Sequence, residues 1–550
     1  MKLCSCYLGF LLAISAVLPA AAAEPSFDLT LSRTIDAEIA AALERDGLTP
    51  SSRATDAEIL RRVYLDLLGR IPTVPEAESY LADAAPDKHH ALIDRLLVHP
   101  EMPAHWKRVV NHWLNGHQPR DGRPPYFDEF LTYLDRSLAA NKPWDRLAHE
   151  LLLPQAGDAD QRGASYFLAC RLGNGDKLEQ LDNLTTAVAG SLFGVQLQCA
   201  KCHDHPFVED WKQDHYYGLA AFFQRVERQN GNGQFTLRER ADGETKFVTV
   251  KKEERTAAAM FLDGVVLDEP RPPTKGGDSK QDISDFAGRR AKLIAHAIDQ
   301  GSPFFRRSVV NRIWKELLGR GLVEPVDQMH AANPATHPRL LELLADDLGE
   351  HRYDLRRLLG GILHSETYLR SSQWSGTNRP GDEFYATAGL RPLSGTQMAW
   401  SLLVATGGHE TLAARYAKDT KPMSGDSPAV APALRTRWEK EIESEQMAEK
   451  FLLSGSTYEP NASQALFLAF SAPLQKLLAP TGKQLVGELT KLDDAAIPRR
   501  AYLQILSRPP QPDESEALLT YLTTAATTRE QACRDIVWSL LAGAEFRFNH

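Results

Sequence analysis

At 550 residues, with 43% hydrophobic and 25% charged residues, the chain is too long for one compact core and too apolar for wholesale disorder. We expect two to four domains. The formal net charge of −9 gives no reason to expect nucleic-acid binding.

The N-terminus predicts a secretory signal peptide over residues 1–23. It reads "MKLCSCYLGFLLAISAVLPAAAAEPSF", with one early Lys, a long apolar run and an Ala-rich end before Glu24. An uncleaved N-terminal helix is the alternative. Cys4 and Cys6 precede the apolar run, so neither is placed as a lipoprotein acylation site. No later segment is apolar enough to span a bilayer, so we expect a soluble periplasmic or secreted protein, with no stable membrane insertion after cleavage.

Residues 28–228 predict a helical domain. Thr55 with Glu58, and Thr73 with the Glu three residues later, form capping boxes at the starts of two helices. Further helices are expected at 101–115, 126–139 and 144–153. An apolar stripe then predicts a helix over 182–198 that leads directly into a cysteine motif.

The next segment, 229–284, predicts a β-containing insert and a linker. It is rich in Gly and polar residues, "TKFVTV" has the composition of a strand, and "PRPPTKGGDSKQD" that of a linker. The β insert is expected at about 232–268, and the domain boundary near 270–285.

Residues 285–550 again carry helical stripes and predict a second helical domain that ends in a helical hairpin or bundle. Thr336 is expected to cap a helix that begins at Pro338, and 417–430 is expected to be a loop. The predicted fold class is mainly α: two helical domains with a small β-containing insert between them.

The motif "QLQCAKCHDHPF", residues 196–207, carries the strongest chemical signal. Removing the leader leaves four cysteines: Cys170, Cys199, Cys202 and Cys533. In a C-x-x-C-H sequence the thiols add to the vinyl groups of haem c, and the histidine becomes the proximal iron ligand. Cys199, Cys202 and His203 are therefore the predicted haem-binding residues.

Three other interpretations of the motif stay open. A Zn or Fe site would use the two cysteines and His205, with His203 or His215 as a further ligand, and Asp204 adds an oxygen ligand that a haem site does not need. A redox-active disulfide between the cysteines is the second alternative, and chance is the third.

Other polar residues are weaker candidates. His112 is expected to be a packed or surface histidine. In "VDQMHAANPATHP", a turn followed by a helix cap is the simpler interpretation, and a sixth haem ligand, His337 or Met329, is the alternative. No residue is predicted to be catalytic.

Several long stretches resemble the planctomycete cytochrome-c-related family, which pairs two domains of unknown function behind a signal peptide. "LRRVYLDLLGRIPTVPEAESYLAD" and "LFGVQLQCAKCHDHPFVEDWKQDHYYGLAAFF" suggest its first domain. "FFRRSVVNRIWKELLGRGLVEPVDQMHAANPATHPRLLELLADDL" and "ILSRPPQPDESEALLTYL" suggest its second. After Trp113 this chain has "LNGHQPRDGRPP" where the family commonly runs on with an Asp-rich stretch.

The resemblance implies an exported, mostly helical protein. The family's polar positions fall here on Cys199, Cys202, His203, Asp204, His205, Asn333 and His337. The first functional hypothesis is an exported cytochrome-c-like protein with haem c, acting in electron transfer with a redox partner protein. The alternative is an exported non-haem metal-site protein, with Cys199, Cys202, His203 and His205 around Zn or Fe and with Asp204 and His337 as further metal ligands. Its role would be in the breakdown of polysaccharides or sulfated glycans.

Overall fold

A computed structural model describes residues 28–116, 125–155, 157–173, 175–206, 208–231, 234–240, 242–268, 288–411, 462–481 and 484–550. The predicted signal peptide, most of the predicted linker and the expected loop at 417–430 lie outside these residues. None of the helices in the described ranges is long and apolar enough to cross a membrane.

The first half of the chain is helical, as expected. Thr55 with Glu58, and Thr73 with Glu76, form the two predicted capping boxes. The helices are α1 (Thr30–Arg45), α2 (Asp56–Leu68), α3 (Val74–Ala82), α4 (Lys88–Leu97), α5 (Met102–Asn115), α6 (Phe127–Ala139), α7 (Trp144–Leu152), α8 (Tyr166–Ala169), α9 (Lys177–Phe193) and α10 (Gln213–Ala221).

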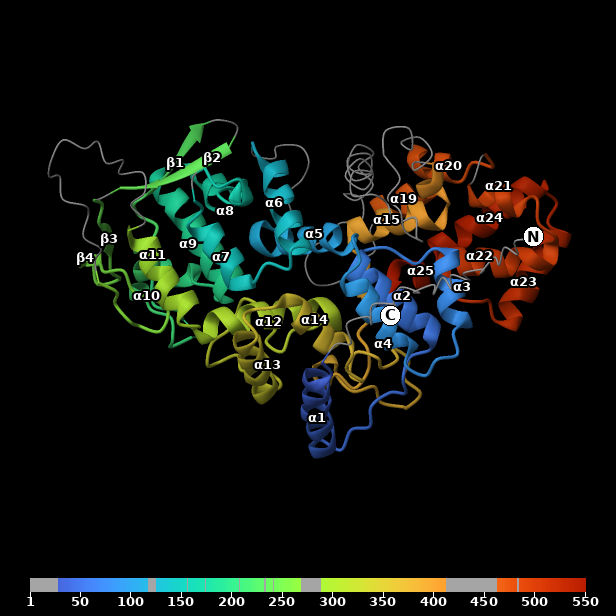
Figure 1. The fold of residues 1–550 in the computed structure, drawn as a ribbon, viewed down its shortest axis with the longest axis horizontal. Coiled ribbons are helices and arrows are strands. Elements are labelled where there is room, and N and C mark those ends of the chain that lie inside the picture. Colours follow the sequence, from blue (N-terminus) through green and yellow to red (C-terminus); the bar gives the residue numbers. More distant parts are fainter. Residues whose placement is uncertain are drawn as a thin grey trace, which may run out of the picture.

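Two antiparallel hairpins follow α10 and confirm that a small β-containing insert interrupts the helices. Strand β1 (Val226–Gly231) pairs with β2 (Gln234–Glu239), and β3 (Thr245–Val248) pairs with β4 (Glu254–Ala257). The first strand begins a few residues earlier than the composition indicated. Both hairpins lie at one end of the elongated molecule (Figure 1).

The second half is also helical, which confirms a mainly α fold. Its helices are α11 (Gly288–Ile294), α12 (Pro303–Leu318), α13 (Pro338–Glu350), α14 (Leu355–Leu363), α15 (Gly395–Ala405), α19 (Ala462–Phe470), α20 (Ala472–Leu477), α21 (Leu485–Leu489), α22 (Ile497–Leu506), α23 (Pro512–Thr524), α24 (Arg529–Ala542) and α25 (Ala544–Arg547). A short ladder joins β5 (Arg391–Pro392) to β6 (Phe548–Asn549).

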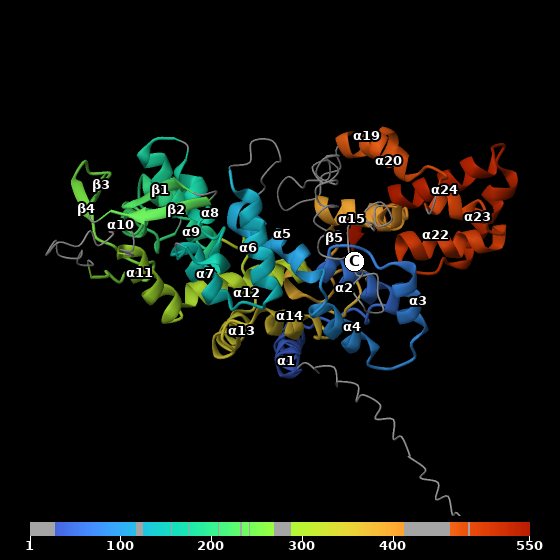
Figure 2. The same cartoon turned by 45° about the horizontal axis from the view of Figure 1, so that its top comes forward.

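The hydrophobic core does not divide at the expected boundary near 270–285. One continuous cluster of buried side chains runs from Leu31 to Ala386 and includes residues of both predicted helical domains. A second cluster, from Leu393 to Phe546, also takes in Leu65 of α2. Figure 2 places α3 beside the C-terminal helix α22, although hundreds of residues separate the two along the chain.

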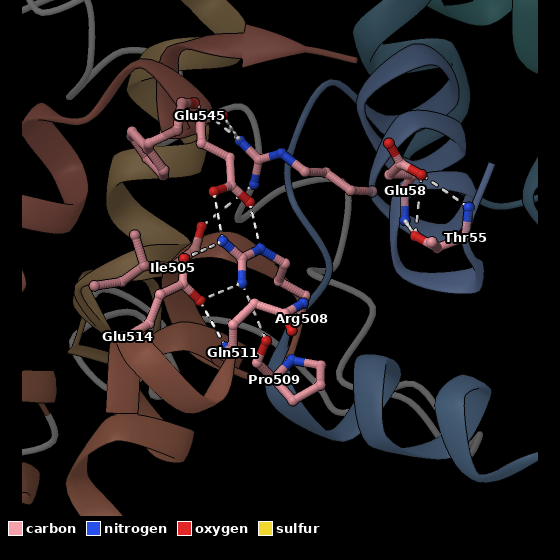
Figure 3. Close-up of polar contacts among 10 residues, drawn as sticks. Thr55, Glu58, Ile505, Arg508, Pro509, Gln511, Glu514 and Glu545 are labelled. Atoms are coloured by element: carbon pink, nitrogen blue, oxygen red, sulfur yellow. Dashed lines mark hydrogen bonds and ion pairs between the residues drawn. The ribbon is translucent and has the colours of Figure 1, made fainter. Parts of the chain in front are cut away.

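Charged side chains hold the C-terminal helices in place. The Arg508 guanidinium binds two carboxylates, with Nη1 2.7 Å from Glu514 Oε2 and Nε 2.6 Å from Glu545 Oε1 (Figure 3). Arg61 of α2 is fully buried and donates to the carbonyl oxygens of Ile505 and Phe546, at 3.3 and 2.9 Å. These contacts fasten the second core to the N-terminal helices.

Candidate functional site at the Cys-x-x-Cys-His turn

The motif lies on a short turn that follows α9. The helix ends at Phe193 because Gly194 adopts a left-handed conformation with φ 68°. A 3₁₀ helix, Gln198–Lys201, then carries the motif. The expectation of a helix over 182–198 that runs directly into the cysteines is therefore wrong: the five residues 194–198 separate Phe193 from Cys199.

Both motif thiols face solvent. Cys199 and Cys202 are exposed and are not joined by a disulfide, whereas Ala200 between them is fully buried and anchors the turn. The remaining cysteines differ in their surroundings: Cys533 is buried and Cys170 is half-buried. The turn thus presents two exposed cysteines that are not joined by a disulfide.

Side chains of α9 and α10 bind the backbone and Lys201 side chain of the turn. The Tyr217 hydroxyl donates to the Lys201 carbonyl at 3.0 Å, and Gln213 Nε2 donates to the Cys202 carbonyl at 3.1 Å. The Lys201 ammonium binds Asp182 of α9 at 2.9 Å. That interaction raises the pKa of Lys201, chiefly through the hydrogen bond. The backbone of the motif is therefore fixed while its thiols stay exposed.

His203 is exposed, and its ring orientation is set by a backbone contact. Nδ1 lies 2.7 Å from the carbonyl oxygen of Asp204. Because a carbonyl only accepts, Nδ1 carries the proton, which leaves the lone pair on Nε2. A hydrogen bond from one ring nitrogen to a backbone carbonyl is the usual way in which a metal-binding imidazole is oriented.

Asp204 and His205 have structural contacts of their own. The Asp204 carboxylate accepts from the Gln213 backbone N–H at 3.0 Å, at the start of α10, where negative charge stabilises a helix. His205 donates its backbone N–H to the Trp211 carbonyl. Within the described ranges, no three side chains of His, Cys, Asp or Glu converge as a group that would hold a metal ion.

A segment of the second half of the chain, 327–331, lies directly against the motif. The Gly194 carbonyl accepts from the Met329 N–H at 3.0 Å, Gln196 Nε2 donates to Asp327 at 2.8 Å, and Asp210 accepts from the Ala331 N–H at 2.8 Å. The sequence marked this segment as dense in polar residues, but it gave no signal that the segment would pack on the cysteine turn.

His330 belongs to this segment and was not among the predicted site residues. Burial lowers its pKa, and the charge of His205 acts in the same direction. The two histidines, one from each half of the chain, therefore lie close enough to interact. The Met329 sulfur packs behind the turn: it would lie 3.0 Å from a Cβ atom added at Gly194.

The structure does not bring His337 to the motif. Its ring is buried beside Tyr385, with 5.4 Å between ring centroids, and burial lowers its pKa, with Arg45 the next contributor. The expected cap at Thr336 is wrong, because the residue at the N-cap position of α13 is His337, and the Thr336 hydroxyl donates to the Leu322 carbonyl instead.

The other predicted polar residues are placed as follows. Asn333 donates to the Gln328 carbonyl at 2.9 Å and shapes the turn of the 327–331 segment. His215 accepts from the Lys212 N–H at the start of α10. His112 lies on α5, and the residues that follow that helix, 117–124, are outside the described ranges.

Covalent haem attachment and a metal cage place different requirements on the turn. Thioether formation requires reduced, accessible thiols, and an axial ligand requires an available imidazole nitrogen. Cys199 and Cys202 meet the first requirement and His203 the second. A metal cage instead requires several side chains that already converge.

Comparison with known proteins agrees with the division of the chain into two parts. Residues 34–228 match the family model PSCyt2, described as a protein of unknown function (DUF1549). Residues 289–522 match PSD1, described as a protein of unknown function (DUF1553). No curated protein and no solved structure matches the chain. The cysteine turn lies in the first matched region and the 327–331 segment in the second, and the two matched regions follow one another along the chain in the order DUF1549, DUF1553.

Proposed function

We propose that the chain is an exported redox protein that carries one haem c, bound through thioethers to Cys199 and Cys202 and through an axial bond to His203. One observation carries the proposal. The same hydrogen-bonded turn holds two exposed, reduced thiols and an imidazole whose Nε2 keeps its lone pair. When bound, the haem would supply one-electron chemistry at its iron.

The residues around the turn have distinct roles in this proposal. Tyr217 and Gln213 fix the two carbonyl groups that flank the second thiol, so both sulfur atoms keep a constant separation. The Asp204 carbonyl holds the imidazole plane. Because Cys199, Cys202 and His203 are exposed, a haem held by them would be accessible to a redox partner protein. Solvent exposure is one of the factors that tune the reduction potential of a haem.

The test is expression with a periplasmic c-haem maturation system. We expect a haem absorption band that stays with the polypeptide after acid–acetone extraction. Cys199→Ser together with Cys202→Ser should abolish it. Cys170→Ser together with Cys533→Ser is the matched control, because it removes the same number of thiols outside the motif, and it should leave the band unchanged.

Two outcomes would overturn the proposal. One is the absence of covalent haem in the wild-type chain under conditions that mature a known c-type cytochrome. The other is stoichiometric Zn or Fe, measured by elemental analysis, in a haem-free protein that loses the metal in the double motif variant. The second outcome would favour the non-haem metal site instead.

Export is part of the same proposal, because c-type haem is attached outside the cytoplasm. Residues 1–23 have the features of a cleavable leader. Cell fractionation and N-terminal sequencing should find the protein in the periplasm or the medium, beginning near Glu24.

A further inference from the structure

Three histidines from distant parts of the sequence form a cluster far from the cysteine turn in the chain. His89 and His90 lie on α4, with 3.9 Å between ring centroids. His364 is the C-cap residue of α14, and its ring centroid lies 4.8 Å from that of His90. His89 and His364 are 7% and 5% exposed. The cluster therefore joins α4 of the DUF1549 domain to α14 of the DUF1553 domain.

The hydrogen bonds of the cluster allow only one proton between the Nδ1 atoms of His90 and His364. His364 Nε2 lies 2.9 Å from Asp94 Oδ1, so the ionised carboxylate places a proton on Nε2. In the neutral ring, His364 Nδ1 then carries a lone pair. His90 Nδ1 lies 2.6 Å from that atom and must donate to it. If both rings were protonated, two N–H groups would face each other at this distance and the bond would break.

The surroundings carry charges of both signs. Arg53 lies near His89 and His90, and its charge lowers the pKa of both; Asp56, Asp87 and Glu366 act in the opposite direction. Lys88 binds Asp56 at 2.7 Å, and Asp36 of α1 accepts from the backbone N–H groups of Glu366 and Thr367. Asp94, 2.9 Å from His364 Nε2, is a further charged neighbour of the cluster.

Burial disfavours the charged form of these imidazoles. It is the largest cause that lowers the pKa of His89 to about 4 and that of His364 to about 3, from an ordinary value of 6.5. The pKa of His90 is lowered in the same direction, again mainly by burial. Nε2 of His89 is also buried with no hydrogen-bond partner, so a proton added there would be unsolvated.

We propose that His90, His364 and Asp94, with His89 packed against them, form a proton-sensitive clasp between the two domains, closed when the imidazoles are neutral and opened when acid adds a second proton to the His90–His364 pair. The clasp does not depend on whether the cysteine turn carries haem.

The sign of the effect follows from the direction of the shifts. Histidines with a lowered pKa in the folded state stabilise the fold above pH 6.5, and this contribution is lost as the pH falls below that value. Between pH 7.5 and 5.0, His89 and His364 should each raise the unfolding equilibrium constant by about 30-fold.

The test combines stability with local exchange in the full-length chain. His90→Gln keeps a polar side chain but cannot take up a proton, so the unfolding constant should rise less between pH 7.5 and 5.0 than it does in the wild type. His351→Gln, at a histidine on the surface beside Asp347, is the matched control and should leave the pH dependence close to that of the wild type.

Hydrogen exchange, corrected for intrinsic rates, should show that the protection factors of α4 and α14 amides fall between pH 7.5 and 5.0 by a larger factor than those of the helices of the C-terminal core. The proposal is overturned if His90 and His364 each titrate near 6.5 in an NMR titration of the folded protein. It is equally overturned if α4 and α14 keep their protection at pH 5.0.

Discussion

The Nδ1 atom of His203 lies 2.7 Å from the carbonyl oxygen of Asp204, the next residue in the chain. This contact turns the other ring nitrogen, Nε2, into the atom that can bind a metal. Both partners of this hydrogen bond belong to the motif, so the turn itself sets the orientation of the ring.

The first prediction concerns this imidazole. His203→Ala keeps both thiols, so the haem should still be attached covalently, but the axial ligand is lost. We expect the absorption band to move and added free imidazole to restore its position. His351→Ala, an exposed histidine on another surface, should leave the spectrum unchanged. A His203→Ala spectrum identical to that of the wild type would show that His203 does not bind the iron.

The second prediction concerns the support of the turn. Tyr217→Phe removes the hydroxyl that donates to the Lys201 carbonyl and should loosen the turn at a cost of about 1 kcal/mol. The fraction of chains with attached haem should fall while the helical circular dichroism is kept. Tyr521→Phe removes a hydroxyl that donates to Asp535 on the surface and serves as the control. Equal haem attachment in both variants would contradict a role for this bond.

The third prediction concerns Arg61, which joins α2 to the C-terminal core. Arg61→Met should lower the free energy of unfolding by about 2–4 kcal/mol, because it leaves buried carbonyl groups of Ile505 and Phe546 without a donor. Burial also lowers the pKa of Arg61 to about 10, so the guanidinium is still charged at neutral pH. Arg45→Met, at an exposed arginine, should change the urea midpoint little; a similar change in both variants would refute the assignment.

The fourth prediction is a pH dependence at Glu514. The hydrogen bonds from Arg508 are the largest cause that lowers the pKa of this carboxylate. A lowered pKa stabilises the fold above the unfolded value of 4.5, and this contribution is lost as the pH falls. Glu514→Gln should therefore have a free energy of unfolding about 1 kcal/mol lower than that of the wild type at pH 7. This difference in free energy should be smaller at pH 3.

Chemical denaturation at the two pH values measures this difference. Glu516→Gln, two residues further along the same helix and exposed, is the control. If the difference in unfolding free energy between Glu514→Gln and the wild type is the same at pH 3 and pH 7, the ion pair between Arg508 and Glu514 does not stabilise the fold.

Local signals were enough to predict the fold class. The capping boxes at Thr55 and Thr73 and the apolar stripes follow from contacts within one or two helical turns, so they can be recognised without tertiary information. The end of α9 was misplaced because the apolar pattern continues past Gly194: Val195 and Leu197 are fully buried although they are not helical. Two buried, non-helical residues therefore happened to continue the apolar spacing of the helix.

Tertiary neighbours could not be predicted in the same way. The contact between Gln196 and Asp327 joins positions 131 residues apart, and that between His90 and His364 joins positions 274 apart. Neither pair has a local sequence pattern that specifies its partner. The thiols and imidazole of the motif were recognisable because their spacing is itself the chemical requirement, whereas His330 and the clasp depend on how separate helices pack.

The most direct test of the haem proposal is the intact mass of the mature chain after c-haem maturation, with peptide mapping of the region around Cys199–His203. The account predicts a mass increase of one haem, located on the peptide that contains both motif cysteines and absent from the Cys199→Ser, Cys202→Ser variant. An unmodified mature chain, or a haem on any other peptide, would contradict it.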